Sequence, residues 1–248
     1  MEEVINNAFY DELGENWYHD SCHPIALLRA ENAARTPWIA KKILNQFMKK
    51  PCVICDQGCG AGFLANALAK EGHHVVGVDL SAKSLATARA HDETKSVAYL
   101  KADASKLPFE DESFDVVTSL DFLEHIEDPK KTIDEAARVL KPGGLFFFHT
   151  FNRNPICWLV VVKGVEWFVK NTPKKMHVYK LLVRPSWVKK WCQENDMEVK
   201  EIHGVNPKID RAFFKMLRTG EVPDDLTFHM TKSTTCGYLG YAKKLVKS

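Results

Sequence analysis

The sequence lacks the features that mark several classes of protein. It has no apolar run long enough to span a bilayer, and no internal repeat or low-complexity segment. Its 34 lysines and arginines nearly balance its 32 aspartates and glutamates, so its charge gives no indication of nucleic-acid binding. The acidic opening, residues 1–7, has the pattern of neither a signal peptide nor an arginine-rich transit peptide. These absences predict a globular protein of the cytoplasm, and 248 residues suffice for one large domain with a sizeable core.

The seven cysteines do not form the framework of a small secreted protein, and their number is odd. A reducing cytosol fits them better. Cys52, Cys55 and Cys59 lie close enough in sequence to suggest metal ligands. However, the first two belong to a predicted buried strand and the third to a glycine loop, and free cysteine is commonly a small core residue. We therefore favour a packing role for all three.

The most informative stretch is residues 53–62, Val-Ile-Cys-Asp-Gln-Gly-Cys-Gly-Ala-Gly. A short apolar strand ends at Asp56, and Gly58, Gly60 and Gly62 then form a tight turn before a predicted helix. Glycines allow the dihedral angles of the turn and let a ligand approach the backbone closely. The start of the following helix offers unpaired N–H groups to an anionic ligand group.

A second apolar run, residues 74–79, ends in Asp79 about 20 residues after the glycines, and Leu80 follows it. A carboxylate at that place can accept hydrogen bonds from ribose hydroxyls, so we expect a nucleoside cofactor. The GxGxG pattern lacks the last glycine of a dinucleotide-binding loop, and D-x-G-C-G-x-G is a motif that is common in methyltransferases. We therefore favour S-adenosylmethionine and a methyltransferase over a dinucleotide and a dehydrogenase. A glycine turn without a ligand is the remaining alternative.

Strands alternate with helices from residue 51 onward, which predicts a parallel sheet with right-handed crossovers. The predicted strands are 52–56, 74–79, 97–102, 114–120 and 144–150, and the predicted helices are 62–71, 82–91 and 129–140. Ligands of such sheets bind beyond the carboxyl ends of the strands, where the motifs fall. We expect an α/β fold of the Rossmann-like class I methyltransferase kind, mostly parallel, with an antiparallel C-terminal edge pair and helices on both faces.

The chain divides into four predicted segments. Residues 1–50 form an N-terminal helical cap, and residues 51–154 form the S-adenosylmethionine-binding core. Residues 155–184 are an apolar and basic insertion, and residues 185–248 complete the sheet. In the cap a helix runs over 25–49 with a break at Pro37, and it either folds over the cofactor or packs on the sheet edge. In the last segment Ser186 caps a helix, and strands over 197–205 and 237–243 give the edge pair.

Further site residues are predicted at the ends of the third and fourth strands. Asp103 can accept a hydrogen bond from an adenine amino group, and Ala104 can supply a backbone N–H. The alternative is that Asp103 caps a turn before Ser105. Leu120 ends the fourth strand and is expected under the methyl donor.

The exit of the fourth strand carries Asp121, Glu124 and His125. If this exit is helical, they fall at i, i+3 and i+4 on one face, where they could hold a hard divalent ion such as Mg²⁺. Alternatively, His125 and Glu124 act as catalytic acid–base groups without a metal. His149, in the next strand, is either a second base or a hydrogen-bonded core histidine.

The insertion is the least expected part of the chain. Residues 156–169 are too few to span a membrane and too apolar for an ordinary surface helix. Lysines occur in and after this run, at Lys163, Lys170, Lys174, Lys175 and Lys180. Tryptophans with nearby lysines suit an interfacial helix on anionic lipid. The alternative is a lid packed on the catalytic core, and both hold if the lid admits a lipid substrate.

Several motifs resemble those of the ubiquinone-biosynthesis O-methyltransferases, in the same order. They are Asp-Gln-Gly-Cys-Gly-Ala-Gly, Leu-Glu-His-Ile-Glu-Asp-Pro, Leu-Lys-Pro-Gly-Gly, Thr-Phe-Asn-Arg-Asn and Gly-Tyr-Leu-Gly-Tyr-Ala. The resemblance implies S-adenosylmethionine, a divalent ion, and a catechol-type hydroxyl of a polyprenylated ubiquinone precursor as acceptor. Its cofactor residues match Arg35, Gly58 to Gly62, Asp79 and Leu120, and its metal ligands match Asp121, Glu124 and His125.

The sequence departs from that family at three places. The family has glutamate at position 121 and a small residue at position 149, and residues 206–235 align poorly. The resulting expectation is an S-adenosylmethionine-dependent O-methyltransferase that binds an anionic membrane surface peripherally, at its inner face. A complex of ubiquinone-biosynthesis proteins is a further expected partner, and nucleic acid is not. The alternatives are an O- or N-methyltransferase of a soluble metabolite, and a non-catalytic membrane-associated scaffold.

Overall fold

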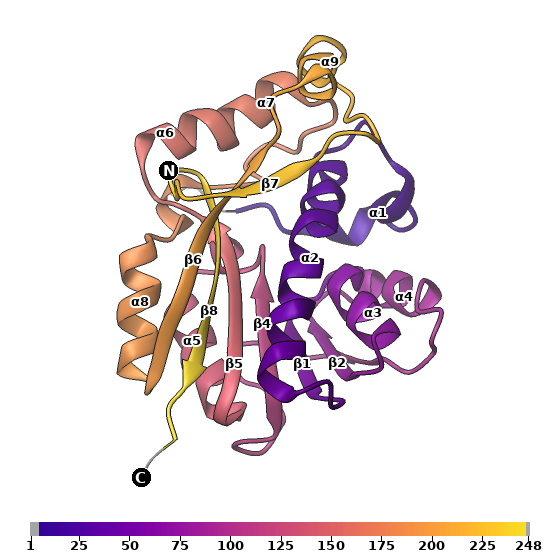
Figure 1. The fold of residues 1–248 in the computed structure, drawn as a ribbon. Coiled ribbons are helices and arrows are strands. Elements are labelled where there is room, and N and C mark those ends of the chain that lie inside the picture. Colours follow the sequence, from indigo (N-terminus) through magenta and orange to yellow (C-terminus); the bar gives the residue numbers. More distant parts are fainter. Residues whose placement is uncertain (1–4, 247–248) are drawn as a thin grey trace.

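The computed structural model describes residues 5–246 and shows one eight-stranded sheet with helices on both faces (Figure 1). The strand order is β3-β2-β1-β4-β5-β8-β6-β7. The strands are β1 (Val53–Gln57), β2 (His74–Asp79), β3 (Ala98–Lys101), β4 (Phe114–Leu120), β5 (Leu140–Phe151), β6 (Met197–Pro207), β7 (Phe228–Thr231) and β8 (Gly237–Lys244). β1 to β5 pair in parallel, and β6 to β8 join them antiparallel. The predicted fold class is confirmed.

The parallel half follows the sequence pattern closely. β1 pairs with both β2 and β4, so the carboxyl ends that carry the motifs meet at one edge of the sheet. β5 begins at Leu140 and not at 144 as predicted, because Leu140 is fully buried and pairs with Phe114 across an irregularity in the register. The Lys-Pro-Gly-Gly segment forms this irregularity within the strand, where Gly143 has φ +80°.

The antiparallel half agrees with the prediction in its pairing and differs in its edge. The predicted strands over 197–205 and 237–243 pair antiparallel as β6 and β8, and β8 runs between β5 and β6. β7, which the sequence did not predict, pairs with β6 and forms the edge. It is only four residues long, which gives little alternating pattern to recognise, and Phe228 and Met230 fasten it against Val205 and Leu239 of the core.

Two groups of helices cover the faces of the sheet. One face carries α2 (Ile25–Phe47), α3 (Phe63–Lys70) and α4 (Ala82–Ala90), and the other carries α5 (Pro129–Val139) and α8 (Pro185–Glu194). α8 begins after Arg184, and Ser186 does not cap it as predicted. Pro185 occupies the first helical position and has no N–H to be capped, so the helix starts without a side-chain cap.

α2 is not interrupted at Pro37, contrary to the prediction. The helix is continuous and ends at Met48 in the left-handed region. Beyond the proline, Ile39 and Ile43 are fully buried in the core. Their packing holds the second half of the helix on the sheet although Pro37 contributes no N–H to the helical ladder.

A third group of helices lies beyond the carboxyl ends of the parallel strands (Figure 1). It comprises η1 (Ala8–Glu12), α1 (Asn16–His19), α6 (Pro155–Cys157), the π-helix η3 (Trp158–Lys163), α7 (Gly164–Phe168), η4 (Tyr179–Leu181) and α9 (Arg211–Thr219). A small core of Ala26, Val169, Met216 and Leu226 joins the insertion to α2 and α9. Within residues 5–246, no helix combines the length and the apolar character needed to cross a membrane.

Candidate active site

A cavity of about 640 Å³ opens at the carboxyl ends of β1, β2 and β4, and we call it the glycine-loop cavity. It is lined by nine of the ten predicted cofactor residues, namely Arg35, Asp56, Gly58, Gly60, Asp79, Leu80, Asp103, Ala104 and Leu120. Gly62 is the exception. It precedes α3 with φ +77°, and a Cβ there would collide with the Tyr99 hydroxyl and lie 2.9 Å from Ala88. Gly62 therefore serves the packing of α3.

Asp79 ties the glycine loop to the end of β2. Its carboxylate accepts hydrogen bonds from the backbone N–H of Gly60 at 2.9 Å and of Ser81 at 2.8 Å. Gly60 has φ +50°, and a Cβ at that position would lie 3.0 Å from the Trp17 ring. Burial raises the pKa of Asp79, while these N–H groups oppose the rise. The loop, the acid and Trp17 of the cap thus form one wall of the cavity.

Arg35, Asp121, His149 and Glu31 form a buried network, of which Arg35 and Asp121 line the cavity. The Arg35 guanidinium donates to both carboxylate oxygens of Asp121, one of them at 2.9 Å. His149 lies between Asp121, 2.6 Å from Nδ1, and Glu31, 2.9 Å from Nε2. Burial opposes the charged ring, but the two carboxylates outweigh it and raise the pKa of His149 to about 9. Burial likewise opposes ionisation of Asp121, yet Arg35 and His149 hold its pKa well below the usual range.

The network settles the two alternatives for His149. The ring is fully buried between two carboxylates, so it is a charged, hydrogen-bonded core histidine and does not serve as a free base.

The exit of β4 is not an α-helix, so the predicted common face of three residues does not form. Asp121 has φ +50°, and only the short turn η2 (Leu123–His125) follows it. As a result Asp121 joins Glu31 and His149, whereas Glu124 and His125 gather with His177 from the insertion. In each trio, one ligand atom from each residue lies within 4.8 Å of the others.

Glu124 is a buried carboxyl group with an unsatisfied oxygen. Its Oε2 accepts a hydrogen bond from Thr150 at 2.7 Å, while Oε1 finds no hydrogen-bond partner in the described part of the chain. Burial, reinforced by the charge of Asp121, raises the pKa of Glu124 to about 7. Such a group can accept or release a proton near neutral pH.

His125 is held by the N-terminal cap. Its Nε2 lies 3.2 Å from the Tyr10 hydroxyl, and its Nδ1 lies 3.2 Å from Asn7 Oδ1. Burial lowers the pKa of His125 to about 3 and that of His177 to about 4, so both rings are neutral. The two rings have centroids 5.1 Å apart.

A second cavity of about 720 Å³ adjoins these groups, and we call it the apolar cavity. Its walls come from η1, α2, the insertion, β6 and α9, and they are mostly aliphatic and aromatic. Glu124, His125 and His177 line it as well. Tyr10, Leu28, Asp121 and His125 line both cavities, so the two meet at this point.

Sequence reasoning missed Glu31, Tyr10 and His177. Tyr10 belongs to an aromatic opening that carries no recognisable spacing, and His177 lies in a lysine-rich stretch. Each reaches the site only through tertiary packing, so a local pattern had no means of identifying it.

Comparisons with known proteins place the chain among methyltransferases. A family model described as "Methyltransferase domain" matches residues 55–148. The chain is 37% identical to the ubiquinone biosynthesis O-methyltransferase of Pseudomonas fluorescens, over 80% of this chain and 84% of that protein. It is 34% identical to the enzyme of the same name from Cronobacter sakazakii, over 85% and 86%.

Solved structures agree with the fold. Magnesium protoporphyrin IX methyltransferase from Synechocystis, which was solved with bound S-adenosylhomocysteine, matches with a TM-score of 0.60 at 15% identity, over 98% of this chain and 90% of that chain. An S-adenosylmethionine-dependent methyltransferase from Methanosarcina mazei matches with a TM-score of 0.56 at 20% identity, over 83% and 98%.

Proposed function

Because the chain belongs to the ubiquinone biosynthesis O-methyltransferase family, we propose that its two cavities hold the two reactants of one methyl transfer. The protein is an S-adenosylmethionine-dependent O-methyltransferase of ubiquinone biosynthesis. The glycine-loop cavity takes S-adenosylmethionine, and the apolar cavity takes a polyprenylated phenol with a catechol-type ring. The observation that supports this assignment is that Tyr10, Leu28, Asp121 and His125 line both cavities, so the two cavities adjoin each other. Donor and acceptor bound in adjoining cavities would have their reacting groups close together.

The cofactor assignments follow from the lining of the glycine-loop cavity. Asp79 is anchored by two backbone N–H groups and retains lone pairs for ribose hydroxyls. Asp103 and Ala104 lie at the end of β3 for the adenine, and Leu120 lies beneath the methyl donor. Arg35 reaches this cavity while bonded to Asp121, so it shapes the floor under the reacting groups.

The chain also supplies a proton acceptor. In the reaction the acceptor oxygen bonds to the methyl carbon, and the carbon–sulfur bond breaks with its electron pair passing to sulfur. The hydroxyl proton must leave, and Glu124, which lines the apolar cavity and has one buried oxygen without a hydrogen-bond partner among the described residues, would receive it. Its pKa of about 7 suits a general base at neutral pH. Neutral His125, held by Tyr10 and Asn7, orients the acceptor hydroxyl.

A divalent ion, implied by the family resemblance, fits one part of this site. Glu124, His125 and His177 offer a carboxylate with an unsatisfied oxygen and two neutral imidazoles. Asp121 fits less well, because Arg35 and His149 already occupy its oxygens. A cation held by the first three would lower the pKa of a bound phenol and stabilise the phenolate.

The polyprenyl chain is assigned to the apolar cavity and its rim. Leu159, Val160, Trp167 and Phe168 of the insertion line the cavity and also expose about half of their surface outward. An apolar tail can therefore continue from the cavity onto this surface. Each buried methylene is worth about 0.8 kcal/mol, so the tail should dominate acceptor binding.

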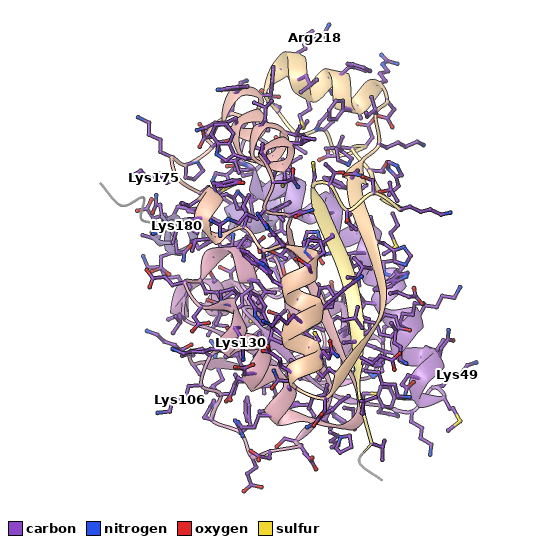
Figure 2. The ribbon with its side chains drawn as sticks, turned by 90° about the vertical axis from the view of Figure 1, so that its left-hand side faces the viewer. Lys49, Lys106, Lys130, Lys175, Lys180 and Arg218 are labelled. Carbon is purple, nitrogen blue, oxygen red and sulfur yellow. The ribbon has the colours of Figure 1, made fainter. Side chains whose placement is uncertain are left out.

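The same surface supports the proposal of peripheral membrane binding. Besides the insertion, Ile209 and Phe214 are 71% and 61% exposed near α9. Figure 2 shows Arg218 at the tip of this end of the molecule and Lys175 and Lys180 lower down, on one side. Exposed apolar side chains with basic neighbours suit the interface of an anionic membrane. We place the protein at the cytoplasmic, inner face of such a membrane.

The test compares catechols that differ only in their prenyl chain. Purified protein with S-adenosylmethionine should methylate a farnesylated catechol with kcat/KM at least ~10-fold above the unprenylated ring, mainly through KM. Equal values would favour the alternative of a soluble metabolite as acceptor. Binding of S-adenosylhomocysteine without turnover of any catechol would favour the scaffold.

A further inference from the structure

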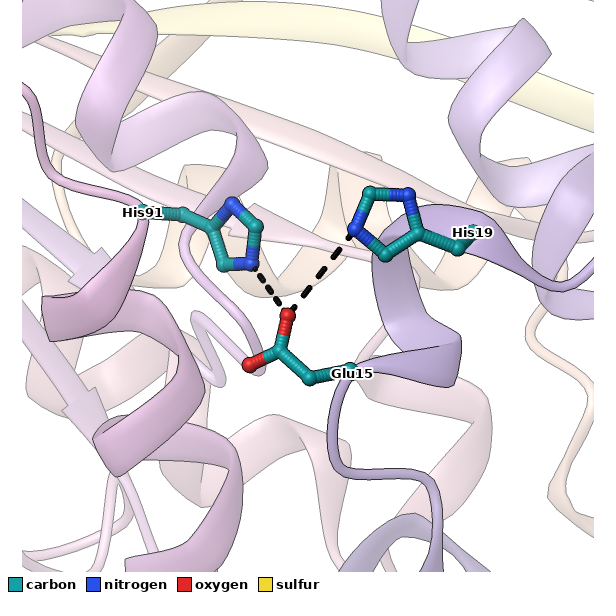
Figure 3. Close-up of side chains that lie close together, drawn as sticks. All are labelled: Glu15, His19 and His91. Carbon is teal, nitrogen blue, oxygen red and sulfur yellow. Dashed lines mark hydrogen bonds and ion pairs between the residues drawn. The ribbon is translucent and has the colours of Figure 1, made fainter.

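A second cluster of possible metal donors lies outside the active site, on the outer side of the cap. Glu15 precedes α1, His19 lies one helical turn later, and His91 follows α4 of the core. Figure 3 shows the Glu15 carboxylate between the two rings. Its Oε2 lies 2.8 Å from His91 Nε2 and 3.9 Å from His19 Nε2. One ligand atom from each of the three residues lies within 4.8 Å of the others.

We propose that Glu15, His19 and His91 bind a transition-metal ion of the Zn²⁺ class and thereby fasten the cap to the cofactor-binding core. Two imidazole nitrogens and one carboxylate oxygen are a donor set typical of Zn²⁺ and not of Mg²⁺ or Ca²⁺. Ligand atoms around a tetrahedral zinc ion are about 3.3 Å apart, given bonds of about 2.0 Å. The separations between the donors therefore need to change by at most about 1.5 Å.

A site of this kind can form if some of its ligands are free to move and others are already held in place. The side chains of His19 and Glu15 are 72% and 64% exposed, so they can rotate to complete the coordination. His91 is 25% exposed, and its ring stacks on Tyr18 with centroids 3.6 Å apart at 8°. A ligand whose ring is already oriented loses little conformational freedom on binding.

The cluster is coupled to the glycine loop through the cap. Tyr18, which orients His91, donates a hydrogen bond from its hydroxyl to the Ala61 carbonyl at 2.8 Å. Trp17 beside it packs over Gly60. Both residues belong to α1, the helix that carries His19 and begins next to Glu15. An ion at the cluster would thus hold α1 against the loop.

The consequence for the reaction rests on the proposed function. Cap residues Tyr10, Asp11 and Trp17 form part of the wall of the glycine-loop cavity. If that cavity holds the cofactor, tying α1 to α4 stabilises the closed wall and favours the bound state. Zinc and S-adenosylhomocysteine should then strengthen each other's binding, as linkage requires.

The test begins with zinc alone. Chelator-treated full-length protein is titrated with ZnCl₂ by calorimetry, and with CoCl₂ to read tetrahedral coordination by absorption. His19→Gln should weaken one binding event at least ~10-fold and remove its cobalt bands, since it deletes one of three ligands. His177→Gln reports on the active-site trio, and His74→Gln, an exposed histidine at the start of β2, is the matched control. Unchanged zinc binding in both His19→Gln and His91→Gln overturns the proposal.

The second arm measures dissociation of S-adenosylhomocysteine with and without zinc. Zinc should slow dissociation in the wild type and in His74→Gln but not in His19→Gln. If zinc binds at the cluster but does not change the dissociation rate of S-adenosylhomocysteine, the proposal that zinc fastens the cap is wrong. If S-adenosylhomocysteine does not bind at all, the proposed function fails, while the zinc titration still decides the metal site by itself.

Discussion

Replacement of His149 by glutamine should remove a stabilising contribution that depends on pH. The pKa of His149 is about 9 in the fold, against 6.5 for an unperturbed histidine. The folded protein therefore keeps a proton that the unfolded chain releases. Each pH unit between these values is worth about 1.4 kcal/mol, which gives about 3 kcal/mol of stability from this one group. That stability is complete below pH 6.5 and is lost as the pH rises through 9.

The assay is urea unfolding of the wild type and of His149→Gln at about pH 6 and about pH 10. The difference in free energy of unfolding between the two proteins should be larger by about 3 kcal/mol at the lower pH. Comparing the two proteins at each pH cancels the titration of groups whose pKa His149 does not influence, such as Asp56. His74→Gln measures the cost of losing an imidazole at the surface.

Two results would refute the reasoning. If the difference between wild type and His149→Gln is the same at both pH values, the ring is neutral in the fold and the ionic network is not what holds it. If the difference grows at the higher pH, the sign of the argument is wrong. Loss of the ring through a cavity or a lost packing contact would lower stability equally at both values.

Three further predictions follow from the site, the core and the surface. Glu124→Gln should lower kcat by about 10²- to 10⁴-fold, and the wild-type kcat/KM should rise with pH through about 7; a flat profile would exclude Glu124 as the base. Gly62→Ala should lower thermal stability more than Gly72→Ala, since both have positive φ but only the first Cβ meets neighbouring side chains. Leu159→Glu should reduce flotation with anionic vesicles and Leu245→Glu, of equal exposure, should not; equal flotation would remove the insertion from the membrane contact.

The positions of the cofactor residues could be predicted because they depend on local sequence. Asp79 and Leu120 each end a strand and Asp56 lies one residue before the end of β1, and in a parallel sheet such ends meet at one edge. The glycine turn and the helix after it are equally local. The alternating pattern predicted a parallel sheet, and the structure supplied the order of its strands.

The acceptor side of the site could not be predicted in this way. Tyr10 lies 115 residues before His125, to which it is hydrogen-bonded, and His177 reaches the same place from the insertion. Contacts of such separation leave no periodicity. At the exit of β4 we applied the i, i+3, i+4 spacing rule, which assumes a helical backbone. The rule failed there because Asp121 has a left-handed conformation.

The side chains at positions 121 and 149 depend on each other. The imidazole of His149 lies between Asp121 and Glu31, 2.6 Å and 2.9 Å from their carboxylate oxygens. Arg35 and His149 keep Asp121 ionised, and the carboxylates in turn raise the pKa of His149. Because Asp121 is thereby occupied, any cation at the active site must draw its third donor from elsewhere. His177 lies with Glu124 and His125 and can offer one, which would make metal binding depend on the position of the insertion.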